Sequence, residues 1–295
     1  MSADQFVQYL VTGLYQGSIY ALVGLGFTII YAVTRIINFA QGEFVMLGGM
    51  LSFILLDSAG IPMYYSVPLS ILIATAVGAL LYTLAIRPAR RASVVSLIII
   101  TIGAAIFIRG LVGELWGVDN QRPPFFTGYE SIPFLGAYIH PQALWIIGVT
   151  ILVTIMLHLF LSHTMVGKAL KACAISPVAA GLVGINAKTM ALIAFALAAA
   201  VGGIGGVVMA PLTFTSYQAG LMLGLKGFVA ASIGGFKSQI AAVIGGFTLG
   251  IVENLAVGVD WGPFSSPYKD AIAIMVLLLI LLLRAGRLAE EETVG

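Results

Sequence analysis

The sequence predicts an all-α fold, a polytopic bundle of transmembrane helices. Of its 295 residues, 60% are hydrophobic and only 9% are charged, whereas soluble domains carry roughly 25% charged residues. A chain with so few charges cannot cover a globular surface with polar groups. Its apolar residues form eight or nine runs, and most of these are long enough for a helix to cross the roughly 30 Å hydrocarbon core of a bilayer.

Nine apolar segments follow one another along the chain. They cover residues 6–33, 44–56, 62–86, 93–116, 142–161, 189–211, 225–236, 239–257 and 271–283. The second and the seventh are too short to span a bilayer alone, so each is a candidate re-entrant segment. The second reaches spanning length only if residues 37–43, INFAQGE, are partly embedded with it.

Basic residues gather in three clusters between these segments. The clusters are Arg87, Arg90 and Arg91; Lys168, Lys171 and Lys188; and Arg284 with Arg287. The topology places all three on one side of the membrane, which the positive-inside rule identifies as the cytoplasm. We therefore predict a multi-pass membrane protein with its N-terminus outside and its C-terminus inside. Such short clusters are typical of topology signals and do not indicate a nucleic-acid partner.

Two halves of the single membrane domain, residues 1–295, resemble each other. A Gly-rich run, a polar break and a short apolar segment occur twice: Ala21-Leu-Val-Gly-Leu-Gly before Phe44-Val, and Ala200-Val-Gly-Gly-Ile-Gly before Phe228-Val. We predict tandem pseudo-repeats over residues 6–116 and 189–286. Transporters built from repeats hold substrate near such paired interrupted helices. Chance similarity between two Gly- and Ala-rich helices is the alternative.

The most polar group within an apolar context is Asn38, Gln41 and Glu43. These side chains either line a substrate path or fix an unwound segment, since an intramembrane carboxylate is a functional candidate by default. The structural alternative is helix capping. Asn38 and Gln41 have the spacing of a capping box, and Glu43 in the first turn suits the helix dipole.

Four further charges lie in or beside apolar segments. Lys226, at the start of the seventh segment, either faces a cavity or reaches to the membrane interface. Glu253 lies about two turns from the nearest loop, so we predict that it turns inward. Arg109 and Glu114 lie near the outer end of the fourth segment and are predicted to reach toward the interface.

No enzyme signature is present. Gly167-Lys168 is followed by Ala169 and lacks the first glycine of a phosphate-binding loop. The three histidines do not form a metal-ligand spacing. We predict that the chain is not an enzyme and binds no cofactor or metal, so any energy for pumping comes from elsewhere. The patterns Gly202–Gly206 and Gly246–Gly250 indicate close helix packing.

Residues 167–187 form the longest soluble-looking stretch on the basic side. Pro177 can occupy the first turn of a short helix that begins after Ser176. Such a helix at the mouth of a membrane bundle is a good docking surface for a soluble partner. The alternative is a connecting loop that is basic because of the topology rule.

These segments together resemble the permease subunits of branched-chain amino acid ABC importers, specifically the H-type subunit. The matching stretches are Gly17-Ser-Ile-Tyr-Ala-Leu22, Gly26-Phe-Thr-Ile-Ile-Tyr31, Ile37-Asn-Phe-Ala-Gln-Gly-Glu43, Arg87-Pro88, Gly167 to Asn186, and Lys226-Gly-Phe228 to Gly235. The resemblance implies a type II importer fold in the bacterial inner membrane. It also implies three kinds of partner: a sister permease subunit, two cytoplasmic ATPase subunits that bind ATP and Mg²⁺, and a periplasmic substrate-binding protein.

The resemblance implies that residues 167–187 contain a coupling helix, around 172–184, that docks on an ATPase subunit. The residues expected in this contact are Lys171, Ala172, Ala174, Pro177, Ala180, Gly181 and Gly184. A zwitterionic substrate needs some polar contacts along an otherwise apolar pathway. The candidates for these contacts are Asn38, Gln41, Glu43 and Lys226.

Three alternatives differ in cargo or in class. The same machine can carry urea or short amides, because cargo is chosen by the binding protein. An ion-coupled secondary transporter would need buried carboxylate or histidine relays in several spans, and only Glu43 and Glu253 qualify. A membrane scaffold without transport activity is the third alternative.

Overall fold

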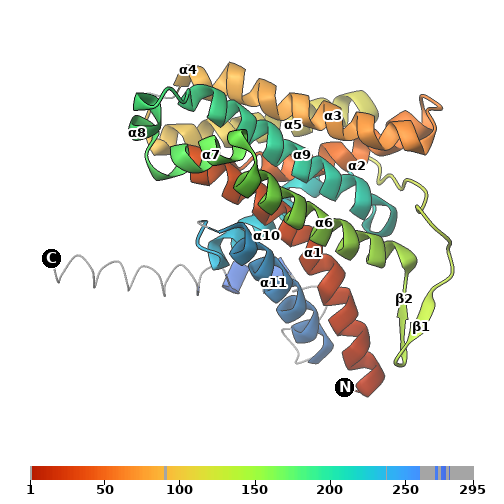
Figure 1. Cartoon of the computed structure of the whole chain (residues 1–295). Coiled ribbons are helices and arrows are strands. Elements are labelled where there is room, and N and C mark those ends of the chain that lie inside the picture. The colour runs from red at the N-terminus through yellow and green to blue at the C-terminus, as the bar shows by residue number, and fades with distance from the viewer. Residues whose placement is uncertain are drawn as a thin grey trace, which may run out of the picture.

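The computed structural model describes residues 2–89, 92–236 and 238–259, together with residues 270, 271, 274–276 and 279. Its elements form a helical bundle with one β-hairpin (Figure 1). In chain order they are α1 Ala3–Thr34, α2 Gln41–Asp57, α3 Met63–Leu81, the π-helix η1 Tyr82–Ile86, α4 Arg87–Ala89, α5 Val94–Trp116, β1 Ile132–Phe134, β2 Ala137–Ile139, α6 Pro141–His163, α7 Met165–Ile175, α8 Pro177–Leu182, α9 Ala187–Thr213, α10 Ala219–Ile233 and α11 Gln239–Val259.

The helices confirm the predicted membrane bundle. Within the described residues, six helical stretches are long and apolar enough to cross a membrane: α1, α3 to α4, α5, α6, α9 and α11. The two segments predicted to be short are helices of 17 and 15 residues, α2 and α10. Most of the ninth predicted segment, residues 271–283, lies outside the described residues.

Helix α2 is the centre of the bundle. Every residue from Gln41 to Ser52 is buried, and the largest core cluster joins α2 to α1, α3, α5 and α9. Helices α3, α5 and α6 instead expose many large apolar side chains. An apolar exterior is what lipid requires, so these three helices provide the lipid-facing side of the bundle.

Glycines allow the central helices to approach each other closely. A Cβ atom added at Gly13 or Gly17 of α1 would meet backbone atoms of α11, and one added at Gly246 or Gly250 would meet backbone atoms of α1. The Gly246–Gly250 pattern therefore packs against α1, as predicted from its small-residue spacing. The pattern Gly202–Gly206 serves the same purpose between α9 and α2.

The two ends of the bundle carry different elements. Helices α4, α7 and α8 lie at one end, whereas the N-terminus and the β1–β2 hairpin lie at the other (Figure 1). The hairpin lies in the stretch between the apolar segments 93–116 and 142–161, and its tip has positive φ at Leu135 (48°) and Gly136 (80°). Arg87 thus shares an end with the basic stretch 167–187. Arg90, Arg91, Arg284 and Arg287 lie outside the described residues.

Candidate functional site

The chain between α1 and α2 is unwound. Arg35 has φ of 59° and ends α1, and helical structure resumes at Gln41. Asn38 Oδ1 accepts a hydrogen bond from the backbone N–H of Ala40 at 3.2 Å, which forms an Asx turn. The N-cap of α2 is Ala40, without a side-chain cap. The capping-box interpretation of Asn38 is therefore wrong, because Gln41 is the first helical residue and not the third.

Gln41 shows how deeply this unwound segment is embedded. Its Nε2 donates to the carbonyl oxygen of Ala198 at 2.9 Å. Ala198 lies eleven residues beyond the first residue of α9, Ala187, so the contact is roughly 16 Å along that helix. Asn38 and Gln41 are both fully buried. Helix α2 therefore begins inside the bundle, as the predicted embedding of residues 37–43 requires.

Glu43 lies where two helices begin. A Cβ atom at Gly42 would overlap the carbonyl oxygen of Gly220, and a Cβ atom at Gly220 would overlap the Glu43 carboxylate. Gly220 is the second residue of α10, so the carboxylate lies at the N-termini of both α2 and α10. Helix N-termini carry partial positive charge and stabilise anions.

Arg109 completes the charge balance at this junction. Its Nη2 lies 2.5 Å from Glu43 Oε1, and the two side chains are 19% and 1% exposed. The prediction that Arg109 reaches toward the interface is wrong, because its guanidinium turns inward to this carboxylate. Glu114 is exposed near the C-terminal end of α5, and its position at the outer interface stays a prediction.

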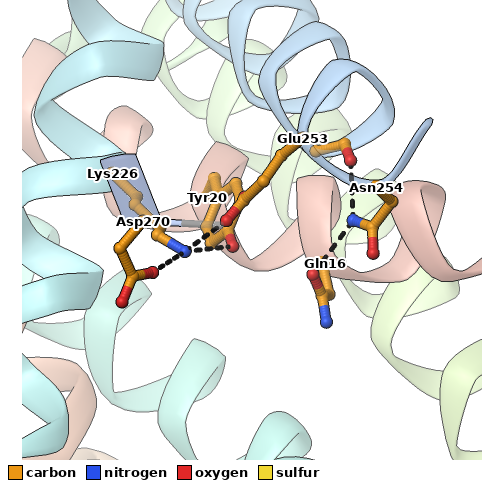
Figure 2. Close-up of polar contacts among 7 residues, drawn as sticks. Gln16, Tyr20, Lys226, Glu253, Asn254 and Asp270 are labelled. Carbon is orange, nitrogen blue, oxygen red and sulfur yellow. Dashed lines mark hydrogen bonds and ion pairs between the residues drawn. The ribbon is translucent and has the colours of Figure 1, made fainter. Parts of the chain in front are cut away.

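Lys226 belongs to a second polar cluster, between α1, α10 and α11 (Figure 2). Its Nζ lies 2.5 Å from Glu253 Oε1 and 2.7 Å from Asp270 Oδ1, and it donates to the hydroxyl of Tyr20 at 3.2 Å. Lys226 is the eighth residue of α10, not the start of a segment, and is only 8% exposed. It faces these partners and does not reach for the interface. Glu253 is 0% exposed, which confirms that it turns inward.

Sequence reasoning missed four members of this polar region: Gln16, Tyr20, Asn254 and Asp270. Asn254 Nδ2 donates to Gln16 Oε1 at 3.0 Å and to the carbonyl oxygen of Gly250 at 2.7 Å (Figure 2). One signal was available in the sequence. Gln16 and Tyr20 are four residues apart in an apolar helix, so their polar groups share one face of α1.

The stretch predicted as a single coupling helix is two helices, α7 and α8. Ser176 separates them with extended backbone (φ −151°, ψ 107°), which is the conformation that a following proline favours. Ser176 Oγ accepts from the backbone N–H of Ala179, and Pro177 occupies the first turn, as predicted. Lys171, Ala172 and Ala174 therefore lie in α7.

The end of α8 is equally well defined. Gly184 has φ of 84°, its N–H donates to Gly181, and the N–H of Ile185 donates to Ala180. These two bonds form a Schellman motif, which stops the helix. Of the predicted contact residues, Lys171, Pro177, Gly181 and Gly184 are exposed, Ala172 and Ala174 are half-buried, and Ala180 is buried.

The exposed surface is apolar along α8 and at its junction with α7, whereas Lys168 and Lys171 are exposed on α7. Ile175, Val178, Leu182 and Val183 are 75–86% exposed, and helices α7 and α8 lie at one end of the bundle (Figure 1). Arg35 ties this region to the membrane helices, because its Nη2 donates to the carbonyl oxygen of Ala174 at 2.9 Å. Large exposed apolar patches often mark interaction sites, so this end of the bundle is a candidate docking surface.

Embedded helix starts, buried ion pairs and an apolar patch at one end define the membrane domain of a transporter. Residues 9–281 match the family described as the permease component of branched-chain amino acid transport systems. The chain belongs to this family, whose members are permease components of ABC transporters and not enzymes. In the described residues, no group of three or more His, Cys, Asp or Glu side chains is placed to hold a metal ion.

Individual relatives agree with this family. The chain is 33% identical to the high-affinity branched-chain amino acid transport system permease protein BraD of Pseudomonas aeruginosa, over 97% of each chain. It is 33% identical to the corresponding permease protein LivH of Escherichia coli, over 94% of this chain and 93% of that one. A probable LivH of Methanocaldococcus jannaschii is 28% identical, over 89% of this chain and 85% of that one.

A solved structure supports the fold alone. The PsaBC complex of Streptococcus pneumoniae, determined with a Fab, aligns with a TM-score of 0.51 at 14% identity. The alignment covers 93% of this chain and 90% of that chain. The arrangement of helices is therefore shared over nearly the whole length.

Proposed function

We propose that this chain is the permease subunit of an ATP-driven importer of branched-chain and other hydrophobic amino acids. The observation that carries the proposal is the family match over residues 9–281, together with near-full-length similarity to permeases named for branched-chain amino acid transport. The chain forms half of the translocation pathway. A sister permease forms the other half, and a periplasmic binding protein delivers the substrate.

Two cytoplasmic ATPase subunits supply the energy, and ATP and Mg²⁺ bind to them. We propose that α7 and α8 dock on one of these subunits. The exposed apolar side chains on this pair of helices support the assignment, because burying an apolar side chain in an interface costs less desolvation free energy than burying a charged one. The proposed contact comprises Lys171, Ala172, Ala174, Pro177, Ala180, Gly181 and Gly184. The hydrogen bond from Arg35 to Ala174 offers a route from this contact to α1.

The substrate pathway is proposed to pass beside the two embedded helix starts. Asn38, Gln41 and Glu43 hold the unwound segment that borders it, and Lys226 contributes charge on the other side of α10. The repeated pattern of a Gly-rich span and an interrupted helix supports tandem pseudo-repeats over residues 6–116 and 189–286. Such paired interruptions are where repeat-built transporters bind substrate.

The experiment that tests the function is uptake by the reconstituted complex. The permease is co-expressed with the sister permease and ATPase genes that neighbour its own, placed in proteoliposomes, and supplied with the neighbouring binding protein. We expect ATP-dependent uptake of leucine. Uptake of urea in place of leucine would reassign the cargo, and uptake by this chain alone, without ATPase subunits, would overturn the proposal.

Charged side chains on α8 are expected to uncouple the transporter. Val178→Glu with Leu182→Glu places two carboxylates in the proposed apolar contact, where each lost anchor costs about 2 kcal/mol. We expect leucine uptake to fall at least about tenfold, with normal amounts of permease in the membrane. Leu135→Glu is the matched control, because Leu135 is similarly exposed (73%) at the opposite end of the bundle. Unchanged uptake by the double variant would count against α8 as the contact.

The proposed orientation puts α8 in the cytoplasm and the hairpin outside. The single cysteine, Cys173, is buried, and burial raises the pKa of its thiol, so Cys173→Ser gives a clean background for labelling. In that background, Val178→Cys is expected to react with a membrane-impermeant maleimide only after cells are opened. Ser131→Cys, in the exposed residues before β1, is expected to react in intact cells. The reverse labelling pattern would show that the chain has the opposite orientation in the membrane.

A further inference from the structure

A cavity of about 220 Å³ lies between α1, α9 and α10. Its apolar wall includes Ile19, Met209 and Leu223, and its polar wall includes Gln16 and Tyr20. Pockets for drug-sized ligands have volumes of about 300–1,000 Å³. This cavity is smaller, and it combines one apolar wall with one polar wall. It therefore suits a small amphiphilic solute.

The charged cluster lies directly behind the polar wall. Tyr20 belongs to both, because it lines the cavity and its hydroxyl accepts a hydrogen bond from Lys226. The ring of Tyr20 also lies 5.3 Å from Lys226 Nζ. Leu223 and Lys226 are three residues apart on α10, so they share a helix face. Tyr20 is therefore the side chain that the cavity and the cluster share.

This cluster has more negative than positive charge. Lys226 contacts two carboxylates, Glu253 and Asp270 (Figure 2). Glu253 is 0% exposed, and its Oε2 has no hydrogen-bond partner among the described residues. An ionised carboxylate only accepts hydrogen bonds, and a buried acceptor without a partner is unfavourable. A cationic donor would satisfy this acceptor and balance the charge, and an ammonium group supplies up to three hydrogen bonds.

We propose that this cavity and the cluster behind it form the station at which the permease holds a free amino acid. The ammonium group of the ligand contacts Glu253 and Asp270, and the ligand carboxylate replaces the Tyr20 hydroxyl as a partner of Lys226. The apolar side chain lies against Ile19, Met209 and Leu223. The inference rests on the proposed import of branched-chain amino acids and adds the residues that recognise the substrate.

The test is direct binding of radiolabelled leucine to the purified transporter complex in lipid nanodiscs, without binding protein and in sodium-free choline buffer. Two competitors dissect the ligand. Isopentylamine keeps the ammonium group and lacks the carboxylate, whereas 4-methylpentanoate keeps the carboxylate and lacks the ammonium group. We expect isopentylamine to compete with leucine and 4-methylpentanoate to compete far more weakly, because two of the three charged side chains of the site are anionic.

Two variants test the residues. Glu253→Gln keeps the shape and removes the charge, and is expected to weaken leucine binding about 10- to 100-fold. Thr213→Trp fills the cavity from an exposed lining position without touching the cluster, and is expected to abolish binding even if Glu253→Gln fails to fold. Glu114→Gln removes an exposed carboxylate at the outer end of α5 and is the matched control, with wild-type binding expected.

Several results would overturn this site while leaving the proposed function intact. The first is wild-type leucine affinity in both Glu253→Gln and Thr213→Trp. The second is competition by 4-methylpentanoate but not by isopentylamine. The third is a complex that still imports leucine but shows no saturable leucine binding. Leucine binding that appears only when sodium replaces choline would assign the carboxylates to a metal cation. Failure of the wild-type complex to import any amino acid with ATP present would instead reject the function.

Discussion

Arg109→Ala is expected to lower the free energy of unfolding by about 3–5 kcal/mol, because it leaves a buried carboxylate without its cation. Glu43 is 1% exposed, and its Oε1 lies 2.5 Å from the Arg109 guanidinium. The N-termini of α2 and α10 remain beside the carboxylate, but a helix dipole contributes at most about 2 kcal/mol in such a position. The measurement is thermal unfolding of the purified protein, together with the amount of folded protein in the membrane.

The two partners of this pair are not equivalent. Glu43→Gln is expected to lower the free energy of unfolding less than Arg109→Ala does. The reason is that the Arg109 side chain is 19% exposed and can extend toward the interface when its partner is removed. Replacing both residues by methionine is expected to recover most of the loss, since an apolar pair carries no desolvation penalty. A wild-type melting curve for Arg109→Ala would show that the pair contributes nothing. If Arg109→Ala and the double methionine variant lower the free energy of unfolding equally, the destabilisation comes from lost packing and not from the unpaired charge.

Local chemistry in the sequence was enough to predict the helices. Eight of the nine apolar segments correspond to helices in the described residues, including the short segments that became α2 and α10. Length and hydropathy are sufficient to predict a helix here, because an apolar segment in a bilayer must form its backbone hydrogen bonds within itself. The break at Ser176 and Pro177 was also predictable, since proline fixes both its own backbone and that of the residue before it.

Side-chain contacts between residues that are far apart in the sequence could not be predicted in the same way. Glu43 and Arg109 are 66 residues apart, and Tyr20 and Lys226 are 206 apart. Nothing local to Arg109 indicates that α2 begins inside the bundle opposite it, so reaching for the interface was the reasonable prediction. The spacing of Asn38 and Gln41 was misleading for the same reason, because the hydrogen bond from Gln41 to Ala198 comes from tertiary packing.

Among the described residues, the ion pairs inside the bundle lie at two places. Helices α2 and α10 each contribute to an ion pair inside the bundle: Glu43, in the first turn of α2, pairs with Arg109, and Lys226, midway along α10, pairs with Glu253. Ion pairs inside a membrane domain persist where the fold supplies partners and helix N-termini. The first pair lies within the core and stabilises the fold. The second shares Tyr20 with the wall of a cavity, which is why we propose substrate recognition for it.

Gly206→Ala is expected to destabilise the protein by about 3 kcal/mol, at the upper end of the range for overpacked cores. A Cβ atom at this position would overlap the carbonyl oxygen of Val45 and lie 2.7 Å from the backbone nitrogen of Gly49. These are backbone atoms of α2, the most buried helix, so no side-chain rotation can relieve the overlap. Helices α2 and α9 must separate instead.

Gly103→Ala provides a control with the opposite expected sign. Apart from the neighbouring backbone of α5 itself, no atom of the described residues lies within 4 Å of a Cβ at Gly103, and alanine favours a helix by about 0.5–1 kcal/mol over glycine. This substitution is therefore expected to be neutral or stabilising in the same thermal unfolding assay. If both variants melt like the wild type, close backbone contact between α2 and α9 does not limit stability. If Gly206→Ala alone lowers the melting temperature, that contact fixes the position of α2, and with it the positions of Gln41 and Glu43 at its embedded start.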